Sequence, residues 1–363
     1  MDFSQTTEQV ELAALARQIV TDVLTPQRLA EVGAEPDRLD RALWQELARS
    51  GVLAAGLPVE VGGDGLGLLA DCAVLVELGR AVAPVPYLAS IVTAGAAVAR
   101  FGDDAQRKAW AEPAGRGELL LTAALTARSP VRARRDGDRW VVDGVATSVP
   151  AGPAADVVLL PAATAAGPVV LAVLPQRDEV TVERQYLVDG QCHGQVALDG
   201  LTLPADRAVG AGADVSSWLR DRATVGLCAL QLGVTERALE LTAEHARTRI
   251  QFGRPIGTFQ AVAQRLADAY VDVEAIRCTM WQAAWRLAEG LGCPTEVATA
   301  KFWAADGGHR VAHTAVHVHG GAGIDLTHPV HRYFVAAKYA EFALGGATDQ
   351  LLRLGAALAA GVA

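Results

Sequence analysis

The chain has 363 residues, 51% of them hydrophobic and 20% charged, a length that exceeds what one core usually organises and predicts two or three domains. Its formal net charge of −9, with no basic cluster, argues against nucleic acid and anionic membranes as partners. Five cysteines without a C-x-x-C pair, and no apolar run near the ~18 residues of a membrane span, predict a soluble cytoplasmic protein without a zinc site or disulfide framework.

Helical periodicity dominates the first 117 residues. Thr6 and Gln9 have the spacing of a capping box, apolar residues recur after them at helical intervals, and Pro26 closes this first helix. The glycine-rich loop 57–67 could be read as a phosphate-binding loop, but no convincing strand precedes it, so we predict a turn before a helix. Further helices are predicted over 40–49, 70–78 and 86–101.

The periodicity changes near Glu118, where short apolar runs separated by Gly and Pro turns begin to predict a β domain. The segment Arg135-Asp-Gly-Asp-Arg-Trp140 has the composition of a hairpin turn. Five strands are predicted, over 119–125, 139–142, 156–160, 169–174 and 196–203.

Helical spacing returns from Ser216 to Ala360 in four long segments, with breaks predicted at 252–259, 290–294 and 319–329. The sequence is therefore expected to form helices, then a small β domain, then a helical bundle.

The most informative motif lies at the first of these breaks and reads Arg249-Ile-Gln-Phe252-Gly253, with Gln260 shortly after it. A guanidinium pairs with phosphate oxygens, an aromatic ring packs on a base, and an amide reads a base edge. The turn therefore suits a nucleotide diphosphate. The structural alternative is a helix hairpin in which Phe252 and Phe259 simply pack in a core.

A second motif, His317-Val-His319-Gly320-Gly321-Ala-Gly323, lies at the last break, and the N-terminus reads Met1-Asp-Phe3-Ser-Gln-Thr-Thr-Glu8-Gln9. Together the three segments resemble the acyl-CoA dehydrogenase family over nearly the whole chain. The resemblance implies an α+β, mostly α fold. Its three domains would be an N-terminal α-helical domain (1–117), a small middle β domain (118–208) and a C-terminal four-helix bundle (209–363).

The resemblance also implies FAD as the cofactor, bound across a dimer interface. One subunit's β domain would hold the isoalloxazine ring, and the neighbour's bundle would hold the adenosine diphosphate end. Glycines allow backbone amides to approach phosphate oxygens closely. On the adenine side the resemblance assigns Arg249, Phe252, Gly253, Gln260, His317 (where the family usually has Gln), Gly320, Gly321 and Gly323.

Three other histidines, His313, His319 and His328, are predicted to pack or to face solvent. No carboxylate or cysteine completes a metal-binding pattern with them, so no metal site is expected.

The isoalloxazine side departs from the family pattern. Of the usual Thr-Glu-Pro…Gly-Ser-Asp stretch only Thr126 remains, and the Gly-Ser-Asp segment is missing. Where the family usually has Trp-Ile-Thr-Asn, this chain has Ser148-Val-Pro150-Ala151. Pro150 offers neither a hydroxyl nor a backbone N–H to a flavin edge.

The catalytic base also departs from the pattern. Dehydrogenation needs a carboxylate that takes the α-proton while the hydride goes to the flavin. The two positions at which the family carries this Glu are occupied here by Leu344 and Ala223. Glu341, one helical turn before Leu344, is the nearest candidate. Its alternative interpretation is a solvated Glu beside Lys338.

These departures predict a non-catalytic, half-site subunit of a flavin-dependent acyl-CoA dehydrogenase, paired with a catalytic sister subunit in an α2β2 complex that acts on an acyl-CoA. The segment His331-Arg332-Tyr333 and the Ala/Arg/Gly-rich composition resemble the actinobacterial heterotetrameric acyl-CoA dehydrogenases of steroid side-chain breakdown. One alternative is a homo-oligomeric acyl-thioester dehydrogenase, acting on CoA or carrier-protein substrates through Glu341. The other is a scaffold of the same fold that binds a thioester or protein partner without redox chemistry.

Overall fold

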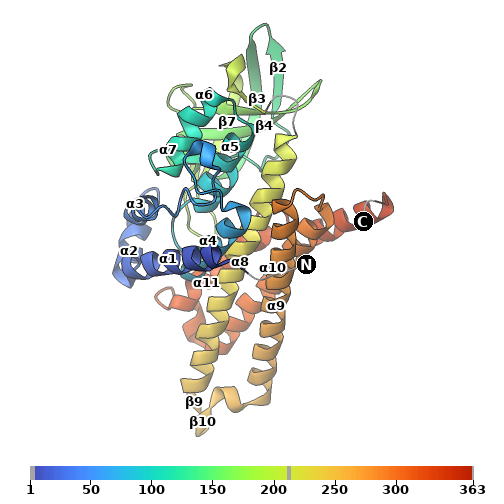
Figure 1. The fold of residues 1–363 in the computed structure, drawn as a ribbon. Helices are drawn as coiled ribbons and strands as arrows, with labels where there is room; N and C mark the ends of the chain where they lie inside the picture. Colours follow the sequence, from blue (N-terminus) through green and yellow to red (C-terminus); the bar gives the residue numbers. More distant parts are fainter. Residues whose placement is uncertain (1–4, 211–213, 362–363) are drawn as a thin grey trace. The chain divides into compact units, whose positions relative to one another are not determined.

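The computed structural model describes residues 5–210 and 214–361 and divides into two compact units. The bundle unit comprises Met1–Val20, Cys72–Ala83 and Thr224–Ala363, and the sheet unit comprises Thr21–Asp71 and Pro84–Ala223 (Figure 1). The N-terminal Met1-Asp-Phe3 part of the family resemblance lies outside the described residues. The three domain limits expected from the sequence stay a prediction.

Short helices make up the N-terminal part of the sheet unit. They are α2 (Pro26–Ala34), α3 (Arg41–Arg49), α5 (Ala96–Phe101), α6 (Asp104–Gln106) and α7 (Glu112–Gly115), with π-helical turns at Leu88–Gly95 and Arg107–Ala111 and a 3-10 turn at Val59–Val61. Helix α2 differs from the prediction, which ends the first helix at Pro26 and places the next one only at 40–49. Proline also suits the first position of a helix, and the Thr25 side chain caps α2 by accepting from Arg28 N–H.

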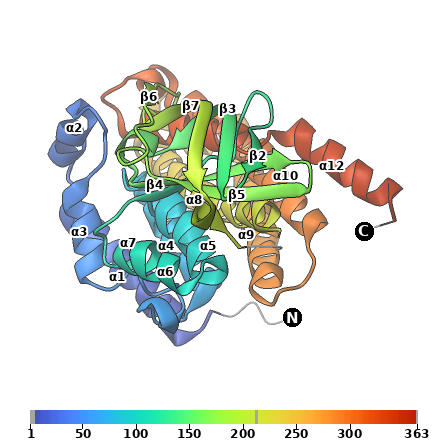
Figure 2. The same ribbon diagram turned by 90° about the horizontal axis from the view of Figure 1, so that it is seen from above.

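The sheet follows in the chain and has the strand order β6-β7-β3-β2-β4-β5-β8, with β1 pairing parallel to β4 (Figure 2). Its strands are β1 (Leu121–Ala123), β2 (Arg132–Asp136), β3 (Arg139–Pro150), β4 (Val157–Thr164), β5 (Gly167–Val173), β6 (Val182–Gln185), β7 (His193–Pro204) and β8 (Ala208–Val209). All five predicted strand segments contain strands. The missed strand β2 carries only one buried residue among five, so it lacks the apolar alternation that marks a strand in sequence.

Two features of the sequence position this sheet. The predicted hairpin turn is confirmed, since Asp136 pairs with Arg139 across the two-residue loop Gly137-Asp138. The inward-facing side chains of several strands then form one apolar core, which includes Val142, Ala146, Val149, Val158, Leu160, Leu171, Val173, Val196 and Leu203.

Long helices build the bundle unit, although α1, α4 and α8 also extend into the sheet unit. They are α1 (Thr7–Val23), α4 (Gly67–Ala81), α8 (Val215–Thr248), α9 (Gln260–Ala288), α10 (Pro294–His319), α11 (Pro329–Phe342) and α12 (Ala347–Ala359). The predicted capping box is confirmed at the start of α1: Gln9 N–H donates to Thr6 Oγ1 at 3.4 Å, and Thr6 N–H donates to Gln9 Oε1 at 3.1 Å. Within the described residues, none of the helices has the length and hydropathy needed to cross a membrane.

The expectation of four helical segments after residue 216 is wrong in one respect, because the last segment divides into α11 and α12. The break lies at Leu344 and Gly345, whose φ angles are 60° and 102°. A left-handed residue followed by a glycine ends a helix, so the Gly345-Gly346 pair was the sequence signal for this break.

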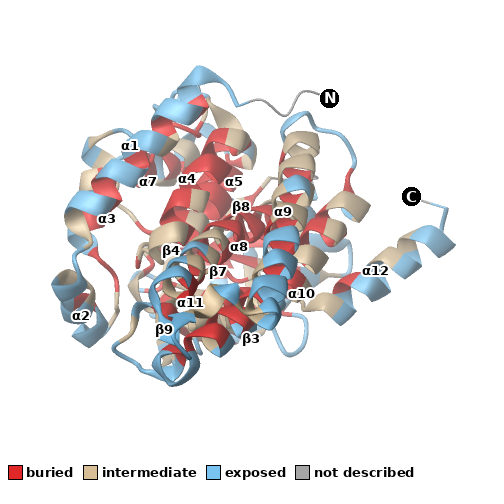
Figure 3. Cartoon of the chain, turned by 90° about the horizontal axis from the view of Figure 1, so that it is seen from below, coloured by how far each residue is buried: buried red, intermediate tan, exposed pale blue. Residues whose placement is uncertain are grey.

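Helix α4 is buried on nearly all sides (Figure 3). Its contact with α8 is made between backbones: a Cβ atom added at Gly79 would lie 2.2 Å from Leu230 O, and one at Gly233 would lie 2.0 Å from Val76 O. Only glycine at both positions allows the two helices of the bundle unit to approach this closely.

Candidate cofactor-binding site

The Arg249 motif forms a small hairpin between α8 and α9. Strands β9 (Ile250–Gln251) and β10 (Arg254–Pro255) pair antiparallel around the turn Phe252-Gly253. The two turn residues have φ angles of 53° and 77°, which is the geometry of a primed type I turn. Phe252 therefore occupies a backbone conformation that is strained for a side chain other than glycine, asparagine or aspartate.

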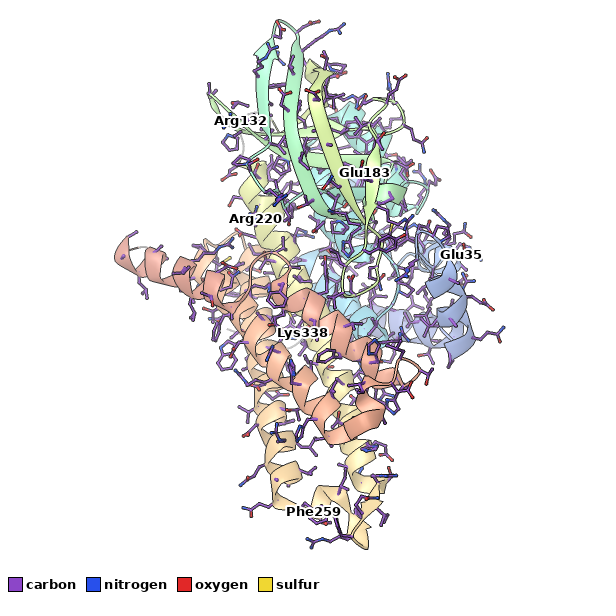
Figure 4. All side chains as sticks on the ribbon, turned by 180° about the vertical axis from the view of Figure 1, so that it is seen from behind. Glu35, Arg132, Glu183, Arg220, Phe259 and Lys338 are labelled. Atoms are coloured by element: carbon purple, nitrogen blue, oxygen red, sulfur yellow. The ribbon has the colours of Figure 1, made fainter. Side chains whose placement is uncertain are left out.

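This turn holds the Phe252 ring in the open. The residue is 93% exposed, and its ring forms a T-shaped pair with Phe259 at a centroid distance of 6.2 Å. The alternative that Phe252 packs in a core is therefore wrong for this chain. Phe259 lies at the hairpin end of the bundle unit in Figure 4, where the Arg254 guanidinium covers its ring at 4.4 Å.

Arg249 and Gln260 flank the hairpin, and both are exposed. The backbone of Arg249 is fixed, because its N–H donates to His245 O at 2.8 Å and its carbonyl accepts from Ile256 N–H at 2.9 Å. Its guanidinium forms no ion pair with any carboxylate in residues 5–210 and 214–361. Arg247, two residues earlier, is paired with Glu244 at 2.5 Å. Arg249 thus combines a hydrogen-bonded backbone with an exposed guanidinium that no carboxylate of the described residues neutralises.

The second motif ends helix α10. His317 is exposed on its last turn, and Gly320 adopts φ 61° and ψ −135°, a conformation open only to glycine. Added Cβ atoms at Gly320 and Gly321 would meet nothing within 4 Å, whereas one at Gly323 would lie 2.7 Å from Val316 O. The first two glycines are therefore open to a ligand, and the third is needed for the turn itself.

A ring stack joins the two motifs. His245, one turn before Arg249 on α8, stacks on buried His319 at the end of α10, with ring centroids 4.3 Å apart and planes 25° apart. His328, the N-cap of α11, also meets His319, in an edge-to-face arrangement with ring centroids 5.1 Å apart. The sequence did not point to His245, since a histidine inside a helix carries no motif of its own. The stack places the ends of α8 and α10 side by side, so both motifs lie at one end of the bundle unit.

These histidines do not form a metal site. Among the described residues, no group of three or more His, Cys, Asp or Glu side chains has an arrangement that could hold a metal ion.

The expected isoalloxazine side lies in the sheet unit, on the second half of β3. The pairing of β3 with β7 is interrupted by a bulge between Ala146 and Val149, and Ser148 in this bulge has a φ of 54°. Thr126 is exposed in the segment before β2, and its carbonyl accepts from Thr147 N–H at 2.9 Å.

The polar backbone groups of this stretch are used inside the chain. Ser148 N–H donates to the Gln185 side-chain oxygen at 2.6 Å, and Ala151 N–H donates to Cys192 O at 2.6 Å. The carbonyl of Pro150 accepts from the Thr122 hydroxyl, also at 2.6 Å. A flavin edge would have to displace these bonds, because such groups bind a ligand only when they are free to do so.

Neither family base position carries an acid. Ala223 is buried on α8 within the sheet unit, and Leu344 lies in the break between α11 and α12 within the bundle unit.

Glu341 is already paired. Lys338 Nζ donates to its carboxylate at 2.6 Å, and His309 Nδ1 lies 3.1 Å from the same oxygen. Its side chain is 14% exposed, so the alternative of a solvated Glu is wrong, although Lys338 is its neighbour as expected. To act as a base, Glu341 would first have to give up its contacts with Lys338 and His309.

The chain matches known proteins along its length. Residues 6–118 match the acyl-CoA dehydrogenase N-terminal domain, and residues 210–359 match the acyl-CoA dehydrogenase C-terminal domain. The chain is 48% identical to the acyl-CoA dehydrogenase FadE27 of Mycobacterium tuberculosis (strain ATCC 25618 / H37Rv), over 99% of both chains.

Solved structures agree with these sequence matches. The structure superposes on a chain of the ChsE4-ChsE5 complex from Mycobacterium tuberculosis with a TM-score of 0.96 and 48% identity, over 99% of both chains. It superposes on a chain of the Tcur3481-Tcur3483 steroid ACAD with a TM-score of 0.93 and 40% identity, over 98% of both chains. The predicted fold class is confirmed. The chain belongs to the acyl-CoA dehydrogenase family of oxidoreductases.

Proposed function

We propose that this chain is the half-site subunit of a heteromeric, FAD-dependent acyl-CoA dehydrogenase. It supplies the adenine-side contacts of each cofactor site, while a sister subunit supplies the isoalloxazine pocket and the base. Bound FAD would provide the hydride acceptor for α,β-dehydrogenation of an acyl-CoA thioester. The names of both matched structures join two different chains, which supports a heteromeric partner.

The observation that carries the proposal is a contrast between the two halves of the site. On the adenine side, the Arg249 guanidinium has no carboxylate partner among the described residues, Phe252 is 93% exposed, and the glycine turn is open. An exposed aromatic ring three residues from such a guanidinium suits a nucleotide diphosphate. These residues fit FAD.

The isoalloxazine side does not fit. Ser148 and Ala151 N–H already donate within the chain, and Pro150 has no N–H to give. The absence of an acid at residues 223 and 344 adds to this, and the pairing of Glu341 counts against the homo-oligomeric alternative.

The substrate class follows from a relative. One matched structure is named a steroid ACAD, so we propose an acyl-CoA with a steroid-linked side chain as the substrate of the complex.

Cofactor stoichiometry tests the proposal. The chain is expressed alone and together with a dehydrogenase encoded beside it, and FAD is counted by absorbance and protein mass by light scattering. We expect a colourless chain alone and two FAD per α2β2 tetramer in the complex. Four FAD per tetramer, or a yellow homo-oligomer that acyl-CoA bleaches, would overturn the half-site role. A chain that is colourless under both conditions would support the scaffold instead.

The variant Arg249→Ala tests the proposed contact between Arg249 and the phosphates of FAD. It should lower FAD occupancy of the complex by on the order of tenfold or more, because a charge-assisted contact to phosphate is lost. The matched control is Arg247→Ala, which removes an arginine already paired with Glu244 and should leave occupancy unchanged. Full occupancy in the Arg249 variant would contradict the proposed contact.

A further inference from the structure

Three imidazoles meet at the end of the bundle unit that carries the proposed adenine-side contacts. His245 and His319 stack at 4.3 Å, and His328 meets His319 at 5.1 Å. His319 is 7% exposed, and His245 and His328 are half-buried. They come from α8, from α10 and from the N-cap of α11, so the cluster depends on tertiary packing.

The hydrogen bonds of the cluster fix where its protons lie. His319 Nδ1 lies 2.8 Å from Ala315 O and must carry the hydrogen, which leaves its Nε2 as the position for a second proton. His328 Nδ1 accepts from Val330 N–H at 3.3 Å, so its hydrogen is on Nε2. These bonds place one proton on each ring and leave Nε2 of His319 as the atom that would take a further proton.

The surroundings lower the pKa of His245 and of His319. Burial lowers the pKa of His245, and His319, Arg249 and His328 lower it further. Burial also lowers the pKa of His319, an effect that the hydrogen bond to Ala315 O opposes and that His328 adds to. The carboxylate that faces the cluster is Asp325, whose own pKa is lowered by its bonds to Thr327 and by His328. Within the described chain, none of the three rings forms an ion pair with a carboxylate.

A diphosphate would reverse this balance. Arg249 directly follows α8, four residues after His245, and its N–H donates to His245 O at 2.8 Å. Gly320 and Gly321 directly follow His319 in the chain. Two phosphate charges bound against these groups would lie close to the stack and would favour its protonated form. The stack also fixes the position of the Arg249 turn relative to the glycine turn, because His245 lies one turn before Arg249 and His319 directly precedes Gly320.

We propose that the stack of His245 and His319, which His328 meets edge-on, takes up a proton when the diphosphate of the cofactor binds, so that cofactor binding tightens as the pH falls. The proposal rests on the proposed function for the identity of the cofactor. Its physical basis is the placement of these imidazoles, which have no carboxylate partner among the described residues, near Arg249 and the open glycines that would hold the phosphates. The histidines act here as positioning residues of the cofactor site.

Calorimetry of cofactor binding measures this proton directly. The co-expressed complex is stripped of flavin and titrated with FAD at neutral pH in two buffers of different ionisation enthalpy, and the difference in heat gives the protons taken up. ADP-ribose is the second probe, because it carries the same diphosphate without the flavin ring. The phosphates of both probes are diesters, which do not titrate near neutrality. We expect net uptake with both, and an affinity that rises by up to about tenfold per pH unit as the pH is lowered.

Variants assign the proton to the stack. His245→Phe and the double variant His245→Phe/His319→Phe keep aromatic rings in place but cannot titrate, and they should bind FAD with much less proton uptake. The matched control is His313→Phe, because His313 also stacks on another histidine of α10, His309, at 4.2 Å and does not touch this cluster. It should leave the uptake unchanged.

Three results would overturn the proposal: no uptake in the wild-type complex, undiminished uptake in both stack variants, or uptake abolished by His317→Gln alone. The last would assign the proton to the exposed contact residue. Failure of the proposed function looks different, because FAD would then not bind the complex, or Arg249→Ala would bind it normally. If the double variant does not fold, the wild-type measurement and the single His245 variant still decide the matter.

Discussion

Lys301 places an ionisable amine in the interior of the bundle unit. It is fully buried on α10, and its ammonium donates to the carbonyls of Ala340 and Glu341 at 2.9 and 3.1 Å. These carbonyls belong to the last turn of α11, where a helix leaves acceptors without partners and a cation is favourable. Burial lowers the pKa of Lys301 to about 8.

The stability of the protein should therefore depend on pH through Lys301. Between about pH 8 and the model-compound pKa of 10.5, the unfolded chain binds more protons than the folded chain, so the stability contributed by Lys301 rises with pH. Relative to Lys301→Met, the wild type should gain on the order of 2 kcal/mol across this window. Chemical denaturation at a series of pH values measures the difference.

One neighbour complicates that measurement. Burial raises the pKa of Cys228 to about 12, so its thiol removes stability as the pH rises above 9. Both proteins are therefore compared in a Cys228→Ala background. A difference between them that is constant with pH would show that Lys301 does not titrate in this range.

Among the elements, the α4–α8 contact should be the most sensitive to small changes. Gly79→Ala and Gly233→Ala each place a methyl group against a backbone carbonyl of the other helix, which cannot move aside without separating the helices. We expect each substitution to lower the free energy of unfolding by about 3 kcal/mol or more. Thermal unfolding of each single variant measures this effect.

The matched control is Gly355→Ala in helix α12. An added Cβ there meets nothing within 4 Å, so it should stabilise the helix by up to about 1 kcal/mol. Equal effects at residues 79 and 355 would mean that helix propensity, and not the close contact, decides both.

The sequence predicted elements well where a local signal exists. The capping box of Thr6 and Gln9, the Asp-Gly turn and the apolar strands of the sheet all carry such signals, and each is present in the structure. The strands β2 and β6 were missed because most of their residues are polar and exposed or half-buried. Apolar and polar residues therefore do not alternate clearly along them.

The candidate site shows the same division. The Arg249 and glycine motifs were found because residue type and spacing suffice to suggest phosphate binding. The histidine stack was missed because His245 and His319 meet only through the packing of α8 against α10. The Gln185 side chain that occupies Ser148 N–H could not be foreseen either, since that bond joins two strands across a bulge.

At the scale of the whole molecule, helix α12 exposes an apolar face. Contact of such a face with water is unfavourable in a separate chain. Only Gln350 of this helix is buried, while Leu351 and Leu358 are 53% and 65% exposed. These two leucines are seven residues apart and therefore lie on one face of the helix. In the proposed heteromer, this face is available to a partner subunit.

The double variant Leu351→Lys/Leu358→Lys should therefore block assembly with the sister subunit without lowering the melting temperature of the separate chain. Both side chains are exposed in the separate chain, so they contribute to stability only when a partner covers them. Light scattering of the co-expressed chains reads the assembly. Ala356→Lys adds a lysine away from this face and should assemble normally. Normal assembly of the double variant would place the interface elsewhere.

The hydrogen bond between Ser148 and Gln185 also constrains how this sequence can change. Removing Gln185 alone leaves a polar N–H without its partner, and replacing Pro150 alone restores nothing while the neighbouring groups stay engaged. Under the proposed half-site role, a return to a complete flavin pocket therefore requires several of these groups to change together. Single substitutions would not make the chain independent of its sister subunit.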